Sequence, residues 1–165
     1  MTPLPEAEAR LAALERAANL AWWAMSCDAT DDASAAAEAA SAAYEHALAD
    51  PAMARAAVAV DATPIEARRA EVLRLLTAGR QRPADLIDRI VGLETRVMAA
   101  HSRYRAEVDG RELDAAAVDR ILQESVDLAE RRAVWTSARG VGAVVEADLR
   151  ELARLRNEAA RALGY

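Results

Sequence analysis

Residues 127–165 read DLAERRAVWTSARGVGAVVEADLRELARLRNEAARALGY and contain the clearest helical pattern of the chain. Apolar residues recur there at steps of three and four, which places them on one face of a helix. That face carries Val145, Leu149, Leu152, Leu155, Ala159 and Leu163. Arg and Glu fill the other face, with Glu151 and Arg154 spaced for an ion pair. We expect an amphipathic helix over residues 144–163 that ends in a left-handed C-cap at Gly164.

The same periodicity predicts helices over most of the 165-residue chain. Alanine, leucine, arginine and glutamate are abundant, and all four favour helix. The main predicted helices cover residues 5–27, 32–49, 64–79, 83–105, 115–125, 126–139 and 144–163. The sequence has no Ser/Gly-rich linker and no repeat of fixed period. We therefore predict an all-α fold class, an array of about seven helices in one helical domain over residues 1–165.

Capping and turn residues mark the ends of these helices. Thr63-Pro64 combines an N-cap residue with a proline at the first helical position. Pro51 starts a further short helix, predicted over residues 51–60. Asp109-Gly110 is a strong turn signal. Around it the sequence is compatible with either a small hairpin or a loop.

Each predicted helix is expected to bury an apolar stripe. The helix over 5–27 carries Leu11, Leu14, Ala18, Trp22 and Met25 at steps of three and four. The helix over 64–79 is expected to use Ile65, Val72, Leu75 and Leu76. The three tryptophans could line a ligand groove, but core or interhelical packing is the better interpretation of Trp22, Trp23 and Trp135.

Composition limits the classes of partner. The formal net charge is −6, and all 21 basic residues that are not histidine are arginine. An acidic chain without a basic face is a poor ligand for nucleic acid. No apolar run approaches the roughly 20 residues that span a membrane, and the N-terminus does not resemble a secretory signal. One cysteine, Cys27, excludes an intramolecular disulfide. We expect a cytoplasmic protein with no nucleic-acid or membrane partner, and a buried, unreactive Cys27.

The sequence lacks the residues of a helical zinc peptidase site. That site needs His-Glu-x-x-His, with two histidines four residues apart on one helix face. The chain has two histidines, His46 and His101, and the residues four positions later are Asp50 and Arg105. We therefore assign no catalytic, cofactor-binding or metal-binding residue in this chain. His46 and His101 are expected to be partly buried helix residues, with His101 packed in the core.

Three segments of the amino-acid sequence resemble a known protein family. They are AVWTSARGVGAVVEADLRELARLRNEAARALGY (133–165), RAEVDGRELDAAAVDRILQES (105–125) and Asn19 to Trp23. All three are similar to the N-terminal helical region of M2 (angiotensin-converting-enzyme-like) peptidyl-dipeptidases and their M3-type relatives. The resemblance extends from about Glu8 to Tyr165. It implies the fold of the lid and channel-wall half of a helical gluzincin peptidase.

The resemblance leads to two hypotheses about function. In the first, the chain is the substrate-gating helical portion of a zinc-dependent peptidase that acts on peptides, and it is not catalytic by itself. Its partner would be the catalytic half, on the same or a companion chain, and zinc is expected in that half. In the second, the chain is a stand-alone, non-catalytic helical protein-interaction module derived from the same fold. The first hypothesis predicts an exposed apolar surface where the catalytic half would dock.

Overall fold

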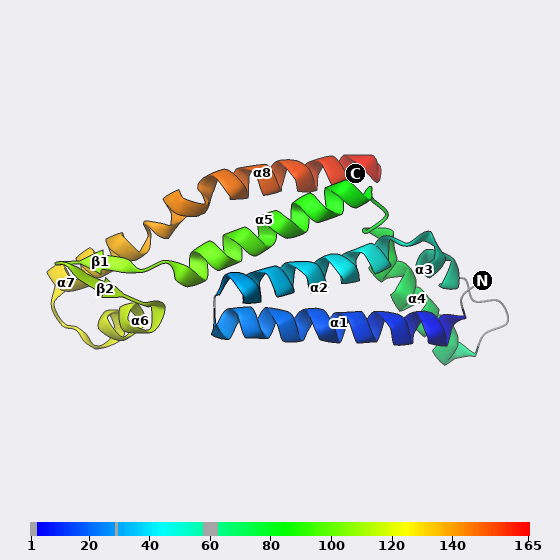
Figure 1. Cartoon of the computed structure of the whole chain (residues 1–165), viewed down its shortest axis with the longest axis horizontal. Helices are drawn as coiled ribbons and strands as arrows, with labels where there is room; N and C mark the ends of the chain where they lie inside the picture. The colour runs from blue at the N-terminus through cyan, green and yellow to red at the C-terminus, as the bar shows by residue number, and fades with distance from the viewer. Residues whose placement is uncertain (1–2, 29, 58–62) are drawn as a thin grey trace.

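A computed structural model describes residues 3–28, 30–57 and 63–165. Most of these residues belong to helices α1 to α8, and two short strands form a hairpin between α5 and α6 (Figure 1). The elements are α1 (Leu4–Cys27), α2 (Asp31–Ala49), α3 (Pro51–Ala56), α4 (Pro64–Ala78), α5 (Ala84–Arg103), β1 (Ala106–Val108), β2 (Arg111–Leu113), α6 (Ala115–Glu124), α7 (Leu128–Ala138) and α8 (Val141–Ala162). The predicted all-α class is confirmed, with a small hairpin added.

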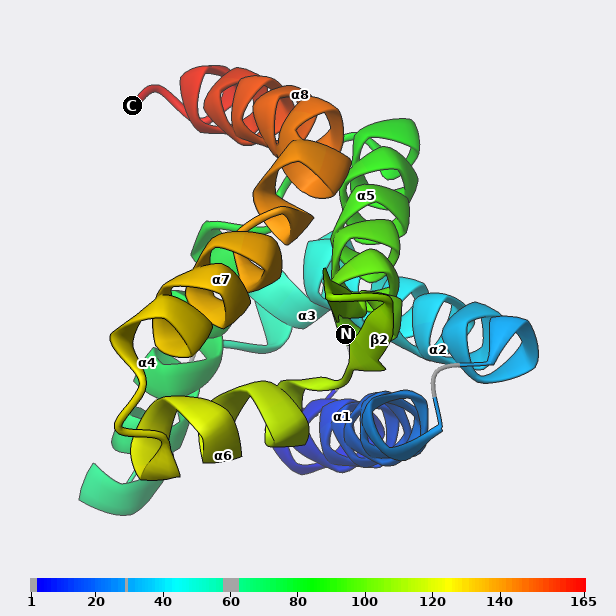
Figure 2. The ribbon, with the colours of Figure 1, turned by 90° about the vertical axis from the view of Figure 1, so that its left-hand side faces the viewer.

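The helices form an elongated array (Figures 1 and 2). α1 and α2 run antiparallel as a helical hairpin, α5 lies against α2, and α8 lies against α5. α3 and α4 lie at one end of this array, while α6, α7 and the β-hairpin form the other end. α5 is therefore the central helix, with a neighbour on each side.

Side chains cap the N-terminal ends of five helices, α2, α3, α4, α6 and α7, close to the predicted starts. The Thr63 hydroxyl accepts a hydrogen bond from the Glu66 amide, and the Glu66 carboxylate accepts one from the Thr63 amide, which completes a capping box. Gly164 has the predicted positive φ, at 87°. α8 begins at Val141, earlier than predicted. α3 is described to Ala56, and residues 58–60 of the predicted segment lie outside the described residues.

Asp109 and Gly110 form the turn of a β-hairpin, not a loop. Both residues have positive φ, 52° and 73°, the backbone of a type I′ turn. This turn matches the twist of the flanking strands, so β1 and β2 pair antiparallel with Ala106 opposite Leu113. Ala106 and Leu113 are buried, as is Val108. The hairpin thus gives α6 and α7 an apolar surface to pack on.

Burial is divided among three clusters along the array. The first contains residues of α1, α2, α3 and α4. The second lies between α5 and α8 only, and the third lies between the β-hairpin, α6 and α7. Their largest members are Leu11, Leu48, Met53 and Leu73 in the first, Leu86, Ile90, Leu93, Leu152 and Leu155 in the second, and Val108, Leu113, Val118 and Val134 in the third. Each end of the molecule therefore has its own apolar core.

The prediction for the buried face of α4 is wrong. Ile65, Val72, Leu75 and Leu76 are all exposed, with Ile65 at 73%. α4 instead buries Ala70, Leu73 and Thr77, which lie on another side of the helix. Leu73 joins the cluster of α1 to α3, and the Thr77 hydroxyl donates to the Leu73 carbonyl. We call the four exposed residues the α4 stripe.

Replacing Leu155 tests the contact between α5 and α8. Leu155 is completely buried among α5 side chains, so Leu155→Ala should lower the free energy of opening of the α5 and α8 amides by about 3 kcal/mol. Hydrogen exchange of those amides measures this change. The control is Leu149→Ala on the same helix, where the side chain is exposed and the loss should stay under about 1 kcal/mol. Equal losses in both variants would contradict the packing described here.

Candidate functional site

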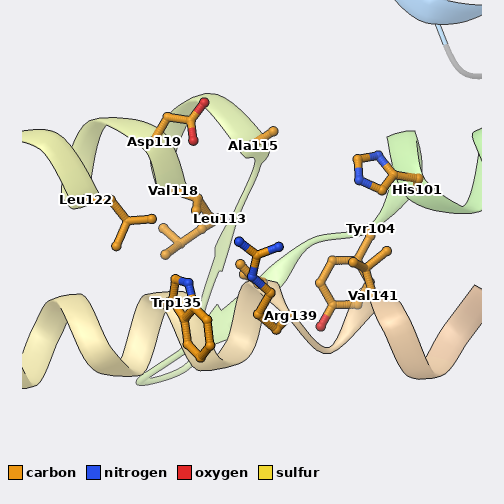
Figure 3. A pocket seen from close by; sticks show the side chains of 12 residues that line it. His101, Tyr104, Leu113, Ala115, Val118, Asp119, Leu122, Trp135, Arg139 and Val141 are labelled. Atoms are coloured by element: carbon orange, nitrogen blue, oxygen red, sulfur yellow. The ribbon is translucent and has the colours of Figure 1, made fainter.

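The β-hairpin end of the molecule contains a pocket of about 240 Å³ (Figure 3). It lies between the end of α5, the hairpin, α6, α7 and the start of α8. Apolar walls come from Leu113, Val118, Leu122 and Val141. Polar groups come from His101, Tyr104, Asp119 and Arg139. The pocket is small, and six consecutive elements of the chain contribute to it.

A hydrogen-bond chain around Tyr104 fixes the geometry of this pocket. The Tyr104 hydroxyl donates to the Ser137 carbonyl at 2.8 Å, which ties the end of α5 to α7. The Ser137 hydroxyl accepts a hydrogen bond from the Glu107 amide at 2.8 Å, which ties α7 to β1. Gly140 lies against the Tyr104 ring, where a Cβ atom would collide with the hydroxyl. The α7–α8 junction therefore needs glycine at position 140.

Arg139 supplies the cation of the pocket. Its guanidinium carbon lies 5.4 Å from the centre of the Trp135 ring, a cation–π contact between residues four apart on α7. Figure 3 shows the guanidinium pointing into the pocket, with Asp119 on α6 and His101 on α5 at separate places along its edge. The lining residues include no nucleophile hydrogen-bonded to a general base. The arrangement can hold a small apolar group beside a positive charge.

A second hollow lies between α1, α2 and α5, where Trp22 meets Tyr44. It has a volume of about 220 Å³ and is bordered by Glu45 and Glu94. Partial burial raises the pKa of the Tyr44 phenol, and the negative charges of Glu15 and Glu45 add to this effect. Tyr44 therefore stays protonated at neutral pH and can donate a hydrogen bond.

The two histidines lie on different helices and do not share a site. The His46 Nε2 atom is 2.6 Å from Asp88 Oδ1, which links α2 to α5. His46 is partly buried, as predicted, but His101 is exposed at the pocket and is not a core residue. Across residues 3–28, 30–57 and 63–165, no group of three or more His, Cys, Asp or Glu side chains is arranged to hold a metal ion.

The prediction that Cys27 is buried is wrong, because it is exposed at the end of α1. Trp22 and Trp23 are 47% and 65% exposed, and Trp135 is also exposed, so none of the three is a core residue. Trp22 lines the hollow between α1, α2 and α5, so interhelical packing, the other predicted role of the tryptophans, is compatible with its position. The Trp135–Arg139 contact was not predicted, although a tryptophan and an arginine four residues apart on a helix are a signal for it. These side chains lie on the surface, available to a partner.

Comparisons with known proteins leave the family open. No family model, no curated protein and no solved structure matches the chain. In the described parts of the chain, none of the helices combines the length and apolar character needed to cross a bilayer.

Adding one methyl group at Gly140 tests the close contact between the α7–α8 junction and the Tyr104 hydroxyl. Gly140→Ala should destabilise the hairpin end by about 1–3 kcal/mol, because the new Cβ atom meets the Tyr104 hydroxyl. Urea denaturation followed by circular dichroism measures the loss. Gly142→Ala is the matched control, since nothing lies within 4 Å of its Cβ position. Tyr104→Phe should relieve the clash in the Gly140→Ala background, and failure to do so would refute this account.

Proposed function

We propose that this chain is a non-catalytic helical portion of an M2/M3-like zinc peptidase, and that it borders the substrate channel and docks on the catalytic half. The observation that supports docking is the accessible surface of the chain, 10516 Å². A compact chain of 17.7 kDa exposes about 8,000 Å². The excess of about 2,500 Å² is comparable to one partner's share of a large obligate interface.

Many large apolar side chains are exposed on the surface of the chain. Those exposed among the described residues are Leu20, Trp22, Trp23, Ile65, Val72, Leu75, Leu76, Met98, Val126, Leu128, Trp135, Val144, Leu149 and Tyr165. Soluble monomers rarely expose apolar patches of more than a few hundred Å². Such side chains on α1, α4, α7 and α8 are consistent with a chain whose faces are covered in a larger assembly.

The α4 stripe is the best-defined docking face. Ile65, Val72 and Leu76 follow one another at steps of seven and four, so they project from one side of α4. The other side of the helix is already packed on α3 and α2 through Leu73. A partner helix lying along the stripe would bury these side chains without disturbing the contacts described here.

The catalytic half is the partner that the resemblance favours. Residues 105–125 and 133–165 resemble the region of M2/M3 peptidases that adjoins the catalytic half and limits entry to its channel. In this proposal the catalytic half supplies zinc and the general base. The chain described here contributes the wall of the channel and excludes folded proteins from it.

The native size and zinc content of the protein test this proposal. The chain should be isolated from its own cells, and intact mass and zinc should be measured on one sample. A zinc-bearing species or complex well above 17.7 kDa that cleaves short peptides is the expected result. A zinc-free species of 17.7 kDa without a catalytic partner would refute the peptidase proposal and leave the stand-alone interaction module.

Polar substitution of the α4 stripe tests the docking face. Leu75→Ser with Leu76→Ser should weaken binding of the catalytic half at least about tenfold, because buried aliphatic anchors dominate interface energies. Binding is measured by surface plasmon resonance with the isolated catalytic half. Arg74→Ser is the control, because Arg74 lies on another side of α4 and pairs with Glu71. If the serine variant binds as tightly as the unmodified chain, the docking face lies elsewhere.

A further inference from the structure

A cavity rich in arginine lies at the end of the molecule opposite the β-hairpin. It is formed where the α4–α5 connection and the start of α5 meet the last turns of α8 (Figure 1). Its volume is about 430 Å³. The charged side chains that line it are Arg80, Arg82, Arg156, Glu45 and Glu94. The charges of these five side chains sum to +1, in a chain whose overall charge is −6.

The ion pairs in this cavity leave one guanidinium without a carboxylate of its own. Arg156 pairs with Glu94 at 2.7 Å, so those two charges are matched. Glu45, in contrast, is shared by two arginines: its Oε2 atom lies 2.9 Å from Arg80 Nε and 2.6 Å from Arg82 Nη2. One carboxylate therefore faces two positive charges.

The excess positive charge beside Glu45 is partly buried. The Arg82 side chain is 12% exposed and the Glu45 side chain is 18% exposed, so water screens their charges less than at the surface. The Arg82 Nε atom is buried and has no hydrogen-bond partner. Arginine keeps its charge at all physiological pH values, so it cannot relieve the imbalance by losing a proton. A second anion in the cavity would relieve it.

We propose that this cavity binds a compact oxyanion, a phosphate or carboxylate group of a small ligand. Arg80 and Arg156 are each about half exposed and present guanidinium donors to the cavity. Guanidinium groups bind such anions through pairs of parallel hydrogen bonds. Arg82 pairs with Glu45 and contributes positive charge, while Tyr165 and Leu163 form part of the wall. The site is separate from the α4 stripe and does not depend on the peptidase proposal.

Isothermal titration calorimetry with inorganic phosphate and with succinate tests this site. The unmodified chain should bind at least one of the two anions saturably with one site, and binding should weaken as salt is added. Binding of phosphate alone would identify a phosphate ligand, and binding of succinate alone a carboxylate ligand. Either result supports the site.

Arg80→Gln is the variant that ties binding to this cavity. It removes an accessible donor but leaves the less exposed Arg82–Glu45 pair intact. We expect it to weaken anion binding about tenfold, because one charge-assisted hydrogen bond is lost. Arg150→Gln is the matched control, because Arg150 is an exposed arginine paired with Glu146 outside the cavity. Saturable binding of neither anion, or unchanged binding by Arg80→Gln, would overturn the proposal.

Discussion

The structure depends on α5 being buried on two sides. Leu86, Ile90 and Leu93 on one side meet α8, while Val91 and Gly92 on another side face α2. Because Gly92 has no side chain, the Glu38 carboxylate of α2 can lie over it, and an added Cβ atom would come within 3.2 Å of that group. Arginine–carboxylate ion pairs join α5 to α2 and to α8 beside these contacts. With α5 held between two helices, the α1–α2 pair and α8 have fixed positions.

Local features of the sequence could be predicted, and long-range ones could not. Capping residues such as Thr63 and the Asp109-Gly110 turn act within a few residues, so their patterns predict a helix start and a chain reversal. The sequence leaves open whether that reversal closes a hairpin or a loop, because strand pairing decides it. The buried face of α4 could not be predicted in the same way. Periodicity identifies an apolar stripe, but it does not say whether the side chains that cover it belong to the same chain.

The pockets also combine local contacts, which the sequence predicts, with long-range contacts, which it does not. Trp135 and Arg139 are four residues apart, so their contact follows from helix geometry. The hydrogen bond from Tyr104 to Ser137, in contrast, joins residues 33 positions apart and requires the folded hairpin. The shared carboxylate of Glu45 depends likewise on α2 and the α4–α5 connection lying together. Both pockets combine segments that are distant in the sequence, so only the structure shows them.

The division of the apolar core into three clusters has a consequence for how the molecule comes apart. Cooperative unfolding requires that the loss of one region removes contacts from the others. Here the hairpin end has its own cluster, and so has the end built from α3 and α4. Each end can open locally while the α5–α8 pair stays closed. A partner bound across several helices would couple these local openings and make the whole chain melt as one unit.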